Sequence, residues 1–181
     1  MKYQTIFDSP VGKLKLVSDG NCLIGLHFTT DQNNGSSFDE ASEPGTEPFP
    51  EVIRQLAEYF QGARTVFEIP IRFIGSPFQV RAWEALQSIP YGETISYKKQ
   101  AERVGSVPRA VGLANGQNPV AIIVPCHRVI GADGHLVGYG GGLNLKKALL
   151  NFEATVRDFG PQPFSLGARR SNPRPVVNSD Q

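Results

Sequence analysis

The sequence predicts an α+β fold, with a small antiparallel β-sheet and a helix in the N-terminal half and a mainly helical C-terminal half. Up to Phe28 the chain consists of short alternating apolar segments separated by turn residues. From Ser76 onward, helix start and stop signals dominate. With 181 residues, 40% of them hydrophobic, the chain is long enough for one domain or two small ones, and we exclude disorder of the whole chain.

The first predicted unit spans residues 1–75 and begins with an antiparallel meander. Its expected strands are Tyr3–Phe7, Leu14–Ser18 and Cys22–Phe28. The polar stretch Thr29–Pro48 has no periodicity and predicts a mobile surface loop. Apolar residues at helical spacing then predict a helix that ends at Gly62, and a further segment alternates as a strand. These residues are Val52, Leu56, Tyr59 and Phe60 for the helix and Phe67–Phe73 for the strand.

The second predicted unit spans residues 76–153 and contains several short helices. Ser76 can cap the first one, and Gln79 completes a capping box. Two short helices follow, with start and stop residues at Ser96 and Gly105 and at Pro108 and Gly116. A helix pair joined by a tight glycine-containing turn matches the helix-turn-helix pattern. Such pairs are also common in other helical domains, so spacing alone leaves DNA binding open.

A buried segment and a glycine-rich loop are expected between these helices and the end of the unit. The β-branched run Val120–Val124 predicts a buried extended segment that leads to Cys126. A helix over Leu143–Phe152 presents Glu153 near its end. Residues 154–181 are rich in Pro, Arg and Ser without an apolar face, which predicts a flexible tail.

Composition narrows the class of protein. The chain has no apolar run of bilayer length and no signal peptide at its start, so we expect a cytoplasmic protein without a membrane partner. Cys22 and Cys126 are too few for a secreted disulfide framework. The net charge of +1 averages acidic and basic segments, and bases outnumber acids between Gly92 and Asn151. That excess is compatible with a polyanionic partner but is weak evidence alone.

A cysteine, a histidine and a carboxylate form the candidate reactive group. A cysteine is a good nucleophile only as its thiolate, and a histidine backed by a carboxylate can remove the proton. Cys126, His127 and Glu153 could supply this arrangement, with a bridging water because adjacent side chains need not face each other. The alternative from the residues alone is an inert buried cysteine beside a surface histidine.

Several spaced motifs resemble the O6-alkylguanine-DNA alkyltransferase family, bacterial type. Pro125-Cys126-His127-Arg128-Val129 is similar to its active-site signature. Other matches occur in the family's order, namely Ile89–Tyr97, Arg109–Gly112, Asn118-Pro119, and Tyr139 with Gly141-Gly142-Leu143. The resemblance covers about Ser76 to Glu153, with a weaker match at Asp8–Gly12.

The resemblance implies a DNA-repair methyltransferase that is consumed by its own reaction. It would move the alkyl group of O6-alkylguanine, and also of O4-alkylthymine, irreversibly and stoichiometrically to Cys126 after base flipping. The implied partner is double-stranded DNA, and no cofactor is required. The first unit would be ribonuclease H-like, and we expect a monomer that could assemble cooperatively on DNA.

The resemblance also implies a role for individual residues. Cys126 would accept the alkyl group, His127 would act as a water-mediated base, Glu153 would orient it and Asn118 would brace the reactive loop. Arg109 would replace the flipped base in the duplex. The remaining expected DNA contacts are Tyr97, Ala110, Gly112 and Arg128, and the expected base pocket comprises Tyr97, Tyr139 and Gly140.

Three alternatives are weighed against this hypothesis. Cys22 and His27 match two of four zinc ligands of some relatives, but the other two have no counterpart, so no metal is expected. A binding-only alkyltransferase-like protein would lack the acceptor cysteine, whereas Cys126 is present. A cysteine hydrolase would require turnover, and a thioether does not hydrolyse.

Overall fold

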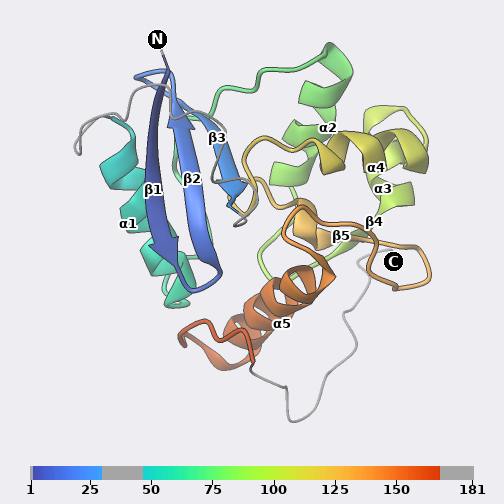
Figure 1. Ribbon diagram of the computed structural model, residues 1–181. Helices are drawn as coiled ribbons and strands as arrows, with labels where there is room; N and C mark the ends of the chain where they lie inside the picture. The colour runs from blue at the N-terminus through green and yellow to red at the C-terminus, as the bar shows by residue number, and fades with distance from the viewer. Residues whose placement is uncertain (1, 30–46, 168–181) are drawn as a thin grey trace.

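The computed structural model describes residues 2–29 and 47–167 and confirms the α+β class (Figure 1). Nearly all of the expected loop Thr29–Pro48, and the tail beyond residue 167, lie outside the described residues. Within the described ranges, no helix is long and apolar enough to cross a membrane.

The N-terminal sheet has three antiparallel strands in the order β1-β2-β3, as expected. They are β1 (Tyr3–Ser9), β2 (Gly12–Ser18) and β3 (Leu23–Phe28). Leu14 and Leu16 of β2 are fully buried, as alternation in a half-buried strand requires. The helix α1 (Phe49–Phe60) packs beside β1 (Figure 1). It buries the apolar side that its helical spacing predicted, including Tyr59.

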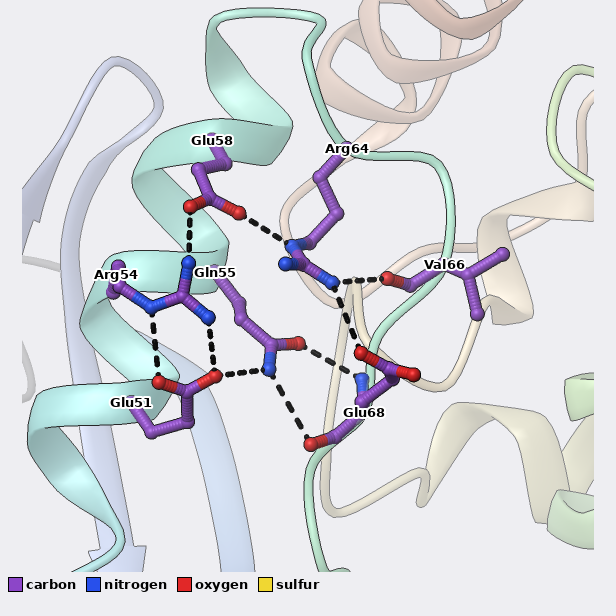
Figure 2. Close-up of polar contacts among 7 residues, drawn as sticks. All are labelled: Glu51, Arg54, Gln55, Glu58, Arg64, Val66 and Glu68. Atoms are coloured by element: carbon purple, nitrogen blue, oxygen red, sulfur yellow. Dashed lines mark hydrogen bonds and ion pairs between the residues drawn. The ribbon is translucent and has the colours of Figure 1, made fainter.

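A polar network fastens α1 to the segment that follows it (Figure 2). Glu58 forms ion pairs with Arg54 on the same helix and with Arg64 beyond its end. The Gln55 side chain, which is buried, accepts a hydrogen bond from the Glu68 N–H at 2.8 Å and donates one to the Glu68 carbonyl at 3.3 Å. The amide therefore satisfies a backbone that has no strand partner at this point.

The expected strand Phe67–Phe73 is wrong, because this stretch forms one isolated bridge. Leu23 donates to the Pro70 carbonyl at 2.8 Å, and the Arg72 N–H donates to the Leu23 carbonyl at 3.0 Å. The bridge pairs Ile71 with Leu23 in parallel. Pro70 has no N–H, so it cannot continue a ladder of backbone hydrogen bonds.

The next three helices follow their sequence signals. They are α2 (Pro77–Gln87), α3 (Tyr97–Val104) and α4 (Pro108–Gly116). Ser76 and Gln79 form the expected capping box. Gly105 ends α3 in the left-handed conformation, with φ of 67°, which glycine adopts at little cost.

Buried polar contacts hold the helix pair α3 and α4 in place. The Gln100 and Asn115 side chains exchange two hydrogen bonds, at 2.9 and 2.7 Å. The Trp83 indole of α2 donates to the Ala114 carbonyl of α4 at 2.8 Å. These contacts fix the inner side of α4, while Arg109 and Leu113 on its outer side are exposed.

The run Val120–Val124 is buried as expected, but it is a turn and not an extended segment. Val120 makes an isolated bridge to Leu26, and Ile122 has a positive φ of 68°. The turn reverses the chain into the short 3₁₀ helix η2 (Cys126–Arg128). Two short parallel strands, β4 (Ile95–Ser96) and β5 (Val129–Ile130), then tie η2 to the start of α3.

The last helix is longer than expected, because α5 covers Leu143–Phe159 and does not end at Phe152. Its apolar side continues through buried Val156. Beyond the helix, the Phe164 N–H donates to the Phe60 carbonyl at 2.7 Å, and its ring packs against those of Phe60 and Phe152. The predicted flexible tail is thus wrong for residues 154–164, which continue α5 and then pack onto the fold through Phe164.

One continuous hydrophobic core joins the two halves of the chain. It contains side chains of the sheet and α1 together with those of α2, the turn before η2 and α5. Cys126, His127 and Glu153 lie where these elements meet.

Candidate active site and DNA-binding surface

A cavity of about 680 Å³ opens beside the helix pair. Side chains of α3 and α4 form one side of it, and the glycine-rich loop before α5 forms the other. Cys126 lies in its wall and is 8% exposed. The expected residues that line it are Tyr97, Arg109, Gly112, Cys126, Tyr139 and Gly140. Ala110, the next residue after Arg109 on α4, is half-buried and does not line the cavity.

Asn118 holds the turn that carries Cys126. Its side-chain amide donates to the Val124 carbonyl at 2.8 Å, and its oxygen accepts from the Val120 N–H at 3.0 Å. Burial raises the pKa of the Cys126 thiol, while a hydrogen bond from Asn118 and the charge of Lys146 oppose that effect. The thiol is therefore protonated at neutral pH and needs a base to react.

His127 is fully buried and has one free ring nitrogen among the described residues. Its Nε2 lies 2.7 Å from Oε1 of Glu153, and no partner contacts its Nδ1. Because an ionised carboxylate only accepts, Nε2 must carry the proton, which leaves a lone pair on Nδ1. Burial, together with the charges of Arg128 and Lys146, lowers the pKa of His127 against the opposing effect of Glu153. The ring is therefore a neutral base.

Glu153 is fully buried and its carboxylate receives five contacts. Oε1 is shared by His127, by the Tyr59 hydroxyl at 2.8 Å and by Nη2 of Arg128 at 3.0 Å. Oε2 accepts from Nε of Arg128 at 2.8 Å and from the Gly92 N–H at 3.3 Å. Burial raises the pKa of Glu153, but hydrogen bonds from His127 and Arg128 and the positive charge of Arg128 outweigh it and hold the pKa far below its usual range.

Arg128 does not lie on the expected DNA-binding surface, and that expectation is wrong. It is 6% exposed, pairs with Glu153 and donates through Nη1 to the Ile89 carbonyl at 2.7 Å. Its guanidinium also lies over the Tyr91 ring, 5.5 Å from the centroid. The neutralisation of a buried carboxylate accounts for its position.

Tyr139 and Tyr97 present phenol groups at the cavity. The Tyr139 hydroxyl is buried without a partner in the described structure, and its ring meets that of His127 at 6.3 Å. Tyr97 donates to the Val137 carbonyl at 2.9 Å, and burial raises the pKa of Tyr97 to about 12. Gly140 is exposed at the rim. An unpaired hydroxyl in a cavity wall is available to donate to a ligand.

Lys146 also lies among the site residues, next to the Tyr97 hydroxyl, although the sequence analysis did not identify it. It is buried, and its Nζ donates to the Val137 carbonyl at 2.9 Å and lies 3.4 Å from the Tyr97 hydroxyl. Burial lowers its pKa to about 8, against the opposing effect of Cys126. Lys146 precedes Glu153 by two helical turns, so helical periodicity could have placed both on one face.

The two residues considered for zinc lie at the two ends of β3, and neither lines the cavity. Cys22 is half-buried just before β3 and His27 is on the strand. Across the described residues, no three His, Cys, Asp or Glu side chains gather to hold a metal ion.

A buried cysteine–histidine–glutamate group beside two short helices joined by a tight turn is the arrangement expected of a DNA-binding protein with a reactive cysteine. Comparison with known protein families identifies the family to which the chain belongs. Residues 1–73 match the ribonuclease-like domain of 6-O-methylguanine DNA methyltransferase, and residues 77–155 match its DNA-binding domain. The chain belongs to the 6-O-methylguanine DNA methyltransferase family, and the predicted class of enzyme is confirmed.

Individual relatives are similar to this chain over most of its length. The chain is 49% identical to a methylated-DNA–protein-cysteine methyltransferase of Mycobacterium tuberculosis, over 83% of this chain and 91% of that protein. It is 51% identical to the protein of that name from Mycobacterium leprae, over 81% and 88%. A crystal structure of M. tuberculosis OGT in complex with DNA superposes with a TM-score of 0.77 at 46% identity, covering 84% of this chain and 93% of that one.

Proposed function

We propose that this protein repairs DNA by moving the alkyl group of O6-alkylguanine irreversibly onto Sγ of its own Cys126. One observation carries the proposal: a nucleophile in the cavity wall lies beside a buried histidine that has a free basic nitrogen and a carboxylate behind it. The complex of the M. tuberculosis relative with DNA supports double-stranded DNA as the partner.

The proposed reaction needs only groups of this chain and one water molecule. The water carries the Cys126 proton to Nδ1 of His127, whose positive charge Glu153 then stabilises. The thiolate attacks the alkyl carbon, an S–C bond forms and the C–O6 bond breaks. The electron pair stays on guanine, which leaves as an anion and takes up a proton. Tyr139 supplies a hydrogen-bond donor for that charge.

Base flipping is part of the proposal, because Cys126 cannot reach a stacked base. In-line attack needs the sulfur behind the alkyl carbon, and Cys126 is 8% exposed at the cavity. Arg109 is exposed at the start of α4 and would fill the space left by the base. Small residues at Ala110 and Gly112 suit the narrow minor groove, and Tyr97 would press on the phosphate.

We also propose the two-domain division at residue 75, a ribonuclease H-like first domain, and a monomeric protein that can assemble cooperatively on DNA. The family matches over residues 1–73 and 77–155 support the division. O4-alkylthymine is included as a second substrate because it offers the same alkyl carbon on an exocyclic oxygen.

Intact-mass measurement tests the proposal. After incubation with excess duplex that contains O6-methylguanine, the protein should gain the mass of one CH₂ group, and peptide mapping should place it on Cys126. Cys126→Ser should gain no mass, because a hydroxyl has a much higher pKa than a thiol. This variant should still bind the duplex. Cys22→Ser is the matched control and should react normally. Repeated turnover, or a label on Cys22, would refute the mechanism.

A further inference from the structure

We infer that Tyr59, which comes from the N-terminal half of the chain, is a positioning residue that sets the basicity of the catalytic His127–Glu153 pair. The inference rests on the proposed function of that pair. It gives the first half of the chain a direct part in the chemistry, beyond its contribution to the core.

The Tyr59 hydroxyl and the His127 ring contact the same carboxylate oxygen. Tyr59 Oη lies 2.8 Å from Oε1 of Glu153, and Nε2 of His127 lies 2.7 Å from it. Tyr59 is fully buried, and burial together with the charge of Glu153 raises the pKa of its phenol well above 10.0. The phenol therefore keeps its proton at all relevant pH values and is always a donor to the carboxylate.

Two sets of contacts fix the position of the Tyr59 hydroxyl. The ring packs against the aromatic rings of Phe67 and Phe152, with centroids 5.4 and 5.7 Å away. The neighbouring residue Glu58 is held by the ion pairs with Arg54 and Arg64, which fasten this turn of α1 (Figure 2). Because the ring and the backbone of Tyr59 are both fixed by other contacts, the side chain loses no further conformational freedom when its hydroxyl forms the hydrogen bond to Glu153.

The hydrogen bond from Tyr59 weakens the pull of Glu153 on the proton of His127. A hydrogen-bond donor to a charged carboxylate takes up part of the negative charge of the carboxylate. The carboxylate then attracts other protons, here the proton on Nε2 of His127, less strongly. Removal of the Tyr59 hydroxyl leaves more of the charge for His127 and should raise the pKa of the imidazole. The histidine would then be protonated, and inactive as a base, up to a higher pH.

The other ionisable groups around the pair do not replace Tyr59. Arg128 and Lys146 are cations that act on the imidazole in the same direction in wild type and variant. The hydroxyls of Tyr91 and Tyr139 have no hydrogen-bond partner among the described residues. The groups that face His127 or Glu153 are Tyr59, Tyr91, Arg128, Tyr139 and Lys146.

Tyr59→Phe removes the hydroxyl and keeps the ring, and Tyr91→Phe is the matched control. Tyr91 lies in the same aromatic group, 6.1 Å from Tyr59 between ring centroids, and its hydroxyl donates to no described residue. The first readout is the rate of single-turnover methyl transfer against pH. Its acidic limb should move upward by about half a pH unit or more for Tyr59→Phe, and should not move for Tyr91→Phe.

The second readout is NMR titration of the His127 ring in the DNA-free protein, which has only three histidines to assign. The His127 midpoint should rise in Tyr59→Phe by the same amount. Fluorotyrosine at position 59, a stronger donor that preserves the fold, should lower it and serves if the phenylalanine variant is unstable. Unchanged midpoints in both variants would overturn the inference. Failure of the wild type to acquire the methyl group would instead overturn the proposed function. The two failures are distinguishable, because the His127 titration does not depend on methyl transfer.

Discussion

The two sides of His127 differ in how completely their polar groups are paired. On the closed side, both oxygens of Glu153 accept at least two hydrogen bonds, from Tyr59, Arg128 and Gly92 among others. On the other side, called the open side because Tyr139 lines the cavity there, Nδ1 of the buried His127 and the Tyr139 hydroxyl have no partner among the described residues. A fully paired cluster fixes positions, whereas unpaired groups in a cavity wall are available to a substrate. Substitutions on the closed side should therefore affect stability and reaction together, and those on the open side reaction alone.

Glu153→Gln should have the largest effect on stability. It leaves the buried Arg128 guanidinium without a negative partner, and breaking such a pair by removal of one member costs about 3–5 kcal/mol. Urea unfolding measures the loss, and the methyl-transfer rate should fall in parallel. Glu102→Gln, on an exposed position of α3, is the control and should change neither.

Acid unfolding tests whether the partners on the closed side hold the Glu153 carboxylate in its ionised form. The pKa of Glu153 is depressed in the fold, so its contribution to stability is complete above the unfolded pKa near 4.5 and is lost as the pH falls below it. The free energy of unfolding of the wild type should thus fall more steeply below that pH than that of Glu153→Gln. Parallel curves for the two proteins would show that the carboxylate is not held ionised by its neighbours.

Phe164→Ala should have the next largest effect, because Phe164 forms the outer layer behind the closed side. Its ring contacts Phe60 and Phe152, both of which pack on Tyr59. Phe→Ala substitutions in cores cost about 3–5 kcal/mol, and this site at the core edge should lie at the lower end. Truncation after Phe159 should lower the melting temperature similarly, whereas truncation after Gly167 should not. Equal melting temperatures for both truncations would contradict this packing.

Arg109→Ala should leave stability unchanged and act on the reaction alone. Arg109 is exposed at the rim of the cavity, so its removal opens no buried space. Repair of duplex DNA should fall far more than reaction with the free modified base, since only a duplex needs the extruded base to be replaced. Kinetics with both substrates measure the ratio. Equal losses would assign Arg109 another role.

Local signals in the sequence predicted the local structure well. The meander, the capping box at Ser76 and the glycine stop at Gly105 all depend on a few adjacent residues, and all are confirmed. The prediction of a strand at Phe67–Phe73 was wrong, because it relied on the alternation of apolar residues and did not account for the missing N–H of Pro70.

Residues with distant partners were harder to predict. The family motifs place Cys126, His127 and Glu153, but they do not show that Arg128 turns inward to Glu153. Tyr59 could be identified only as a core residue at helical spacing. Its partner lies 94 residues away, and no local pattern records a hydrogen bond at that separation.

The contacts of Glu153 also determine when the reactive site can form during folding. They come from α1, from the turn after α2, from η2 and from α5 itself. Closing loops of this length costs chain entropy before the contacts compensate it, so pairings distant in sequence tend to form late. In a refolding experiment, transfer activity should therefore appear after helical structure, and its recovery would report that the two halves of the chain have joined.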